Sequence, residues 1–221
     1  MQLLGIDVLK KVAAAAPRQP VSAVRARLRL EALVLAREEA LVDARASYRI
    51  VPLAAEEGGR LCLDGETLEA PWLLPASGTL TAVACAVCTL GGALEQRVSV
   101  LFAERRAALA VALDALANEL LFALSRQVQD RILAEARKLG LTMAGELRAG
   151  DPGLALAAQA TVLRLAGGAA IGVRVTPGGM MHPVKSTSLV QGVGLALPAA
   201  SWSRCDHCPS RARCAVATQA A

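Results

Sequence analysis

Apolar residues recur at steps of three or four along two stretches of the chain, which is the period of an amphipathic helix. The first stretch follows Pro17 and Pro20, and Ser22 is a suitable N-cap for it. The second stretch is longer. It follows two consecutive glycines at 91–92 and ends near Gly140. Its apolar stripe consists of Leu109, Leu113, Leu116, Leu120, Leu124, Val128 and Ile132. We therefore expect a helical N-terminal segment and a long helical region in the middle of the chain.

Short apolar runs separated by turn residues make up much of the remaining sequence. Glycines and prolines punctuate residues 48–87, a pattern typical of strands joined by turns. Further strands are expected at residues 141–147, 169–176 and 186–195, and a short helix at about 155–165. This order predicts an α+β fold with a largely antiparallel sheet and helices packed to one side.

Composition limits how the core is built and how the chain divides. Of the 221 residues, 54% are hydrophobic but only 2% are aromatic, so Leu, Val and Ala must form the core. The changes of pattern predict three parts: a helical segment at 1–46, an α+β domain at 47–197, and a small, polar, cysteine-bearing tail at 198–221.

Several classes of protein are disfavoured by the sequence. The longest apolar run, residues 80–94, is too short for a membrane span and contains two glycines. The N-terminus lacks the positive region that begins a signal peptide, so we expect a cytoplasmic protein without membrane contact. The net charge is +5, but the basic residues are dispersed and no aromatic residues interleave with them, so no nucleic-acid partner is expected.

Three cysteines of the tail have the spacing of metal ligands. Cys205 and Cys208 form a C-x2-C pair, and Cys214 follows six positions later. In the cytoplasm thiols stay reduced, so clustered cysteines favour a metal or redox site over disulfides. Both a structural zinc site and an iron–sulfur cluster normally take four protein ligands. Either the fourth ligand comes from elsewhere or one position is open.

A second C-x2-C pair, Cys85 and Cys88, lies in an apolar, strand-like run. Side chains three apart on a strand point to opposite faces, so we expect these two to be buried structural cysteines. Cys62 is expected in the core as well. The alternative is that one of the three supplies the fourth ligand of the tail.

Three segments together carry a resemblance to a known family. They are residues 88–117, residues 148–165, and residues 171–194 (IGVRVTPGGMMHPVKSTSLVQGVG). The third is the most specific, with an apolar strand, a Met-Met-x-Pro loop, Lys-Ser, and a second strand that ends in Gly-x-Gly. In this order they resemble the activation domain of cobalamin-dependent methionine synthase. The similarity is closer to stand-alone bacterial proteins that resemble that domain.

The resemblance implies a role in corrinoid reactivation. In that family the domain binds S-adenosylmethionine beside the corrinoid, through an Arg followed by a Pro-Ala-x-Gly-Tyr turn. Here Arg148 and Gly153 match that motif, with Gly150 between them, whereas Leu154 stands in place of the Tyr. An Arg at this position is suited to bind a carboxylate with two hydrogen bonds. The family also places the Met-Met-x-Pro loop near its ligand, which adds Met181, His182, Pro183, Lys185 and Ser186 as candidate binding residues.

These observations predict an accessory protein for a corrinoid-dependent methyl-transfer system. It would bind a corrinoid protein or a cobalamin-dependent methyltransferase and support reductive reactivation of cob(II)alamin. Because reactivation needs an electron, we favour a 4Fe–4S cluster over zinc at Cys205, Cys208 and Cys214. The alternative is a non-enzymatic docking module in which a zinc-containing tail assembles a corrinoid methyltransferase.

Overall fold

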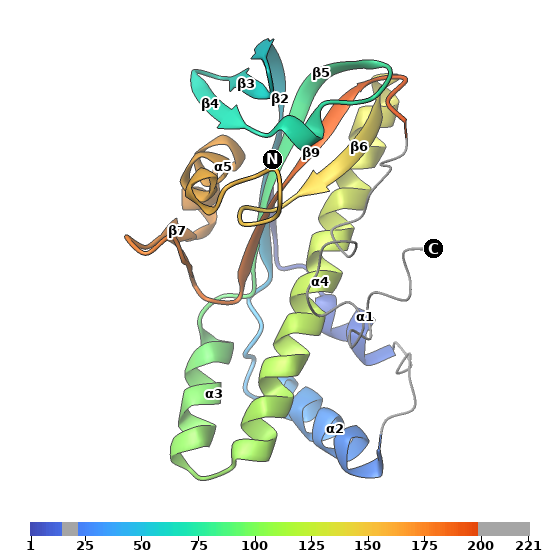
Figure 1. The fold of residues 1–221 in the computed structure, drawn as a ribbon. Helices are drawn as coiled ribbons and strands as arrows, with labels where there is room; N and C mark the ends of the chain where they lie inside the picture. Colours follow the sequence, from blue (N-terminus) through green and yellow to red (C-terminus); the bar gives the residue numbers. More distant parts are fainter. Residues whose placement is uncertain (15–21, 199–221) are drawn as a thin grey trace.

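A computed structural model describes residues 1–14 and 22–198, which form an α+β fold (Figure 1). A seven-stranded sheet lies at one end, and helices extend from it. The strands are β1 (Gln2–Leu4), β2 (Arg45–Glu57), β3 (Arg60–Leu63), β4 (Glu66–Glu69), β5 (Thr79–Thr89), β6 (Thr142–Leu147) and β9 (Ser186–Leu195), with a separate pair β7 (Arg174–Val175) and β8 (Met181–His182). The α-helices are α1 (Val8–Ala14), α2 (Ala23–Glu38), α3 (Ala93–Ala103), α4 (Ala107–Lys138) and α5 (Gln159–Ala166). Short 3-10 turns are η1 (Pro71–Leu73), η2 (Leu156–Ala158) and η3 (Gly168–Ile171).

Every pairing in the sheet is antiparallel, as the sequence predicted. The strand order is β4-β3-β2-β5-β9-β6, and β1 pairs with β2. Strands β5 and β9 are joined over almost their whole length, with Cys85 opposite Val190 and Cys88 opposite Thr187. The sheet therefore brings the end of the chain's described part, β9, beside β6 at its edge.

The two faces of the sheet have separate apolar cores. On one face, α4 packs its apolar stripe against β2, β5, β6 and β9, and α1 and α2 pack on α4 within the same core. On the other face, α5 packs against the sheet together with side chains of β3, β4 and η1 (Figure 1). Cys88 belongs to the first core and Cys85 to the second, and both are fully buried. This confirms that the pair points to opposite faces. Most of the helical mass lies on one side, and α5 alone of these α-helices covers the other.

The long helical region consists of two helices instead of one. Helix α3 ends at Ala103, the backbone turns at Arg105 with a φ of +58°, and α4 begins at Ala107. Helices α2, α3 and the start of α4 form a helical lobe that projects away from the sheet (Figure 1). The apolar stripe of α4 is buried over most of its length. Length and composition would also suit α4 for a membrane span, but a buried core helix has the same properties.

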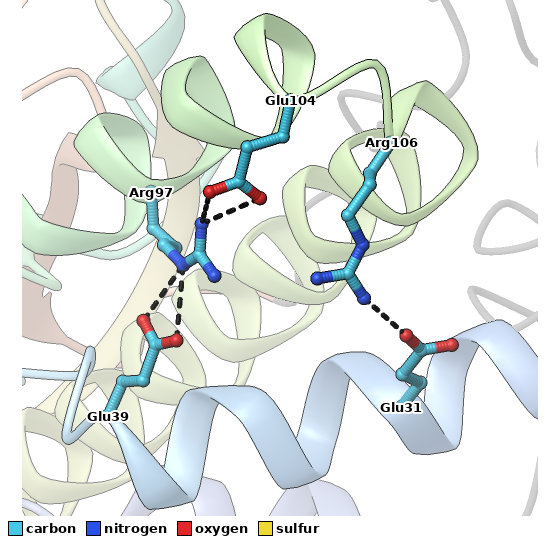
Figure 2. Close-up of polar contacts among 5 residues, drawn as sticks. All are labelled: Glu31, Glu39, Arg97, Glu104 and Arg106. Carbon is cyan, nitrogen blue, oxygen red and sulfur yellow. Dashed lines mark hydrogen bonds and ion pairs between the residues drawn. The ribbon is translucent and has the colours of Figure 1, made fainter.

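Three ion pairs hold the lobe together, and we call them the lobe pairs (Figure 2). Arg97 of α3 bonds to Glu39, just after α2, at 2.9 Å and to Glu104 at 3.3 Å. Arg106, at the start of α4, bonds to Glu31 of α2 at 2.8 Å. Both arginines thus link the α3–α4 hairpin to α2.

Several local predictions are confirmed and two are wrong. The Ser22 hydroxyl caps α2, where it accepts a hydrogen bond from the Arg25 N–H at 3.4 Å. Strands β6 and β9 lie at residues 142–147 and 186–195, close to the expected ranges. Residues 2–4 form a strand instead of helix, because they pair with β2. The expected strand at 169–176 is mostly the turn η3, with only Arg174–Val175 extended.

Candidate functional site

The candidate site lies where α4 crosses the adjacent strands β6 and β9. Strand β6 pairs with β9 with Leu147 opposite Val190, so Arg148, the residue after β6, comes close to the first half of β9. Both strands contact α4 on the same face of the sheet. Arg148 and Thr187, which belong to two of the segments that carry the sequence resemblance, are thereby brought together.

Arg148 has contacts with three elements, which we call the Arg148 cluster. Its Nε and Nη2 donate to one oxygen of Glu146, Oε1, at 3.1 and 2.9 Å. Its Nη1 donates to the Thr187 hydroxyl at 3.1 Å, and Nη2 also donates to the Ser125 hydroxyl at 3.3 Å. The guanidinium carbon lies 5.7 Å from the centre of the Phe122 ring, within cation–π distance. The cluster therefore joins β6, β9 and two turns of α4.

The loop after Arg148 is a compact turn closed by its own backbone. The Arg148 N–H donates to Asp151 Oδ2 at 2.9 Å, and the Gly150 N–H donates to the Leu154 carbonyl at 2.9 Å. Gly153 has a φ of +83°, and a Cβ there would lie 2.5 Å from Cγ of Trp72. Only glycine fits this position, because the indole packs directly on its backbone.

Leu154, which occupies the place of the family's Tyr, is buried in the core beneath α5. Its side chain is therefore not available to a ligand at the surface. The loop keeps its turn geometry without the aromatic residue.

Strand β8 and the segment between it and β9 hold the other predicted binding residues. Met181 is half-buried and packs against the α5-side core, whereas Met180 is exposed. His182 is about two-fifths exposed, and its Nδ1 lies 3.9 Å from Glu95 Oε1 at the start of α3. Pro183 follows a cis peptide bond. The Val184 N–H donates to the other Glu95 oxygen at 2.6 Å, so Glu95 fixes the end of this loop.

Lys185 and Ser186 lie at the start of β9 and are both buried. The Lys185 ammonium bonds to Asp114 Oδ1 at 2.7 Å and donates to Asn118 Oδ1 at 3.0 Å, both on α4. The Ser186 hydroxyl lies 2.7 Å from the Pro183 carbonyl oxygen and 2.9 Å from Thr89 Oγ1. Each polar group at this end of β9 thus has a partner within the protein.

The predicted metal ligands Cys205, Cys208 and Cys214 lie outside the described residues. Within residues 1–14 and 22–198, no group of three or more His, Cys, Asp and Glu side chains is placed to hold a metal ion. Burial raises the pKa of the Cys85 and Cys88 thiols to about 12, so both stay protonated at neutral pH. A metal ligand must be a thiolate, which disfavours these two as the fourth ligand.

Sequence reasoning missed four members of the Arg148 cluster: Glu146, Ser125, Thr187 and Phe122. A signal for Glu146 was present, because residues two apart on a strand lie on the same face. Glu146 lies near the end of the strand that the sequence predicted at 141–147, two residues before Arg148. Ser125 and Phe122 could not be found this way, since their position depends on how α4 crosses the sheet.

Comparison with known proteins supports the predicted fold. No protein-family model matches the sequence, and no curated protein matches it. Among solved structures, the chain is similar to a crystal structure of the MetH reactivation domain bound to AdoHcy, with a TM-score of 0.63. The match covers 87% of this chain and 77% of that chain, at 16% sequence identity. The fold therefore resembles that of the activation domain, as the three sequence segments predicted.

Proposed function

We propose that this protein is an accessory protein of a corrinoid-dependent methyl-transfer system. It would bind a partner that carries the corrinoid and support the reductive reactivation of cob(II)alamin. The observation that carries this proposal is the likeness in fold to the MetH reactivation domain over 87% of the chain. A second support is that Arg148 and the start of β9, which belong to the resembling segments, meet at α4.

Reactivation begins with an electron. One electron converts cob(II)alamin into cob(I)alamin, the nucleophile that accepts a methyl group. We propose that Cys205, Cys208 and Cys214 hold a 4Fe–4S cluster that supplies this electron. The support is their spacing, which suits cluster ligation, together with a function that needs a one-electron donor.

Complex formation tests the first half of the proposal. The purified full chain is mixed with a corrinoid-loaded methyltransferase domain, and sedimentation velocity measures the association. We expect a one-to-one complex that forms with the corrinoid-loaded domain and is weaker with the corrinoid-free domain. Equal binding to both forms, or none, would contradict a role at the corrinoid.

Electron transfer tests the second half. The partner is prepared as cob(II)alamin, and its EPR signal is followed after addition of anaerobically purified protein and a one-electron donor. We expect faster loss of the signal with the native chain than with the variant Cys205→Ser/Cys208→Ser. A preparation that contains zinc and no iron, and that binds the partner without speeding reduction, would favour the docking module instead.

A further inference from the structure

Glu146 occupies the place at Arg148 that a ligand's carboxylate would take. We propose that Glu146 determines the ligand class of this site, by closing it to adenosyl ligands that carry an amino-acid carboxylate. This inference rests on the proposed function, because that function makes the loop after Arg148 a ligand-binding site. It names a class of ligand that this site does not bind. S-adenosylmethionine and S-adenosylhomocysteine belong to the excluded class.

The geometry of the guanidinium supports this proposal. A carboxylate binds an arginine best through two parallel N–H groups on one edge, and Nε with Nη2 form such an edge. In this protein that edge already bonds to Glu146 Oε1. The other nitrogen, Nη1, donates to Thr187, and the Phe122 ring lies against the face. A ligand carboxylate that takes this edge must therefore displace Glu146, and at the other edge, Nη1 with Nη2, it would have to displace Thr187 and Ser125.

The local charge also opposes the binding of a further anion, such as a ligand carboxylate. Arg148 carries one positive charge, and two carboxylates bond to it: Glu146 to the guanidinium and Asp151 to the backbone N–H. The neighbouring cation, Lys185, is paired with Asp114 at 2.7 Å. Two cations, Arg148 and Lys185, thus face three carboxylates, so the net charge of these five groups is negative. A ligand carboxylate would meet like charge with little water to screen it, since the Arg148 side chain is only 14% exposed.

Glu146 competes with a ligand carboxylate for Arg148, and it has the advantage that it belongs to the same chain. Glu146 lies in β6, two residues before Arg148, which directly follows the strand, so the backbone keeps the two side chains close together. A group tethered this closely acts at an effective concentration of roughly millimolar or above. A free ligand at micromolar concentration has no such advantage. The exclusion therefore follows from the position of Glu146 as well as from its charge.

Calorimetry with S-adenosylhomocysteine tests the proposal, since this ligand carries the carboxylate but transfers no methyl group. The native chain is compared with Glu146→Gln, which keeps the shape of the side chain and removes its charge. We expect the affinity for S-adenosylhomocysteine to rise at least tenfold in Glu146→Gln. Adenosine, which has no carboxylate, should bind both proteins equally. The double variant Glu146→Gln/Arg148→Met should lose the gain, and Glu146→Ala serves as a second test if the Gln variant folds poorly.

The outcomes separate this inference from the proposed function. Equal affinity of the native chain and both Glu146 variants for S-adenosylhomocysteine, whether tight or absent, would overturn the role of Glu146. A gain that survives in the double variant would also overturn it, because Arg148 would not be the receptor. Association with the corrinoid-loaded partner, measured on the same proteins, tests the proposed function independently. If the Glu146 variants gained affinity for S-adenosylhomocysteine but no form of the protein bound the partner, the role of Glu146 would be supported and the proposed function contradicted.

Discussion

The Arg148 cluster and the lobe pairs use the same kind of ion pair in different surroundings. Arg148 and Glu146 are 14% and 25% exposed, whereas Arg106 and Glu31 are both 46% exposed. Around Arg148 two hydroxyls and an aromatic ring complete the contacts. The hydrogen bond described for the Arg106 side chain goes to Glu31 (Figure 2).

This difference shows what each cluster contributes. Exposed pairs are screened by water and typically add little to stability. A pair shielded from water is costly to break, because the remaining charge lacks both its partner and full hydration. The exposed Arg106–Glu31 pair thus orients the start of α4 on α2 at little gain in stability, whereas the shielded Arg148 cluster fixes the edge of the sheet and the candidate site.

The largest expected effect comes from Arg148→Met, which breaks the shielded cluster. The substitution leaves Glu146 without its cation and removes a donor from Ser125 and Thr187, two buried hydroxyls. We expect a loss of about 2–3 kcal/mol in the free energy of unfolding, reduced from the fully buried case because Glu146 is partly exposed. Urea unfolding measures it.

A double-mutant cycle shows whether this loss belongs to the pair. Glu146→Gln is combined with Arg148→Met, and the double variant should be less destabilised than the sum of the single variants by about 1 kcal/mol or more. Additive losses would mean that the two side chains do not depend on each other. The shielded Arg148–Glu146 pair would then be no stronger than an exposed pair such as Arg106–Glu31.

An intermediate effect is expected from Tyr48→Phe, where only one of the two partners is charged. The Tyr48 hydroxyl donates to Glu135 Oε1 on α4 at 2.6 Å, at the far end of the same helix–sheet interface. Its loss should cost about 1 kcal/mol, measured by urea unfolding at pH 7. A cost equal to that of Arg148→Met would show that charge pairing adds nothing at this interface.

The same residue gives a pH dependence with a defined sign. Burial, followed by the bond to Glu135, raises the pKa of Tyr48 from 10.0 to about 12. The folded state holds this proton more tightly, so the contribution is complete below pH 10 and is lost as pH rises toward 12. Cys85 and Cys88 titrate in an overlapping range, so the native chain must be compared with Tyr48→Phe at each pH. The difference between the two should shrink from pH 10 to pH 12.

The sequence predicted the parts of this fold that depend on local pattern. Helix and strand periodicity predicts the apolar stripe of α4 and the opposite faces of Cys85 and Cys88. The cap follows from the preference for Ser just before a helix, at Ser22. The break at Arg105 was missed, because no glycine or proline marks it in the sequence. The strand at residues 2–4 was missed because pairing with β2, a distant contact, determines it.

The candidate site was predicted less completely than the fold. The resemblance identified Arg148 and the start of β9, and the structure brings them together through Thr187. The sequence interpretation assigned Arg148 to a ligand's carboxylate, and that role stays a prediction. In the structure its guanidinium bonds to Glu146, a contact that strand alternation allows but that motif comparison does not consider. A motif identifies a residue type at a position, whereas the neighbours decide whether that residue is available.

The smallest expected effect comes from Arg106→Met in the lobe. Both partners of this pair are nearly half exposed, so we expect a loss of about 0.5 kcal/mol in the free energy of unfolding at low salt. Raising the NaCl concentration to 1 M shortens the screening length to roughly 3 Å and should remove most of this loss. The cost of Arg148→Met should change little over the same range, because its surroundings exclude most of the solvent. If the two costs fell in parallel with salt, exposure would not be what distinguishes the two clusters.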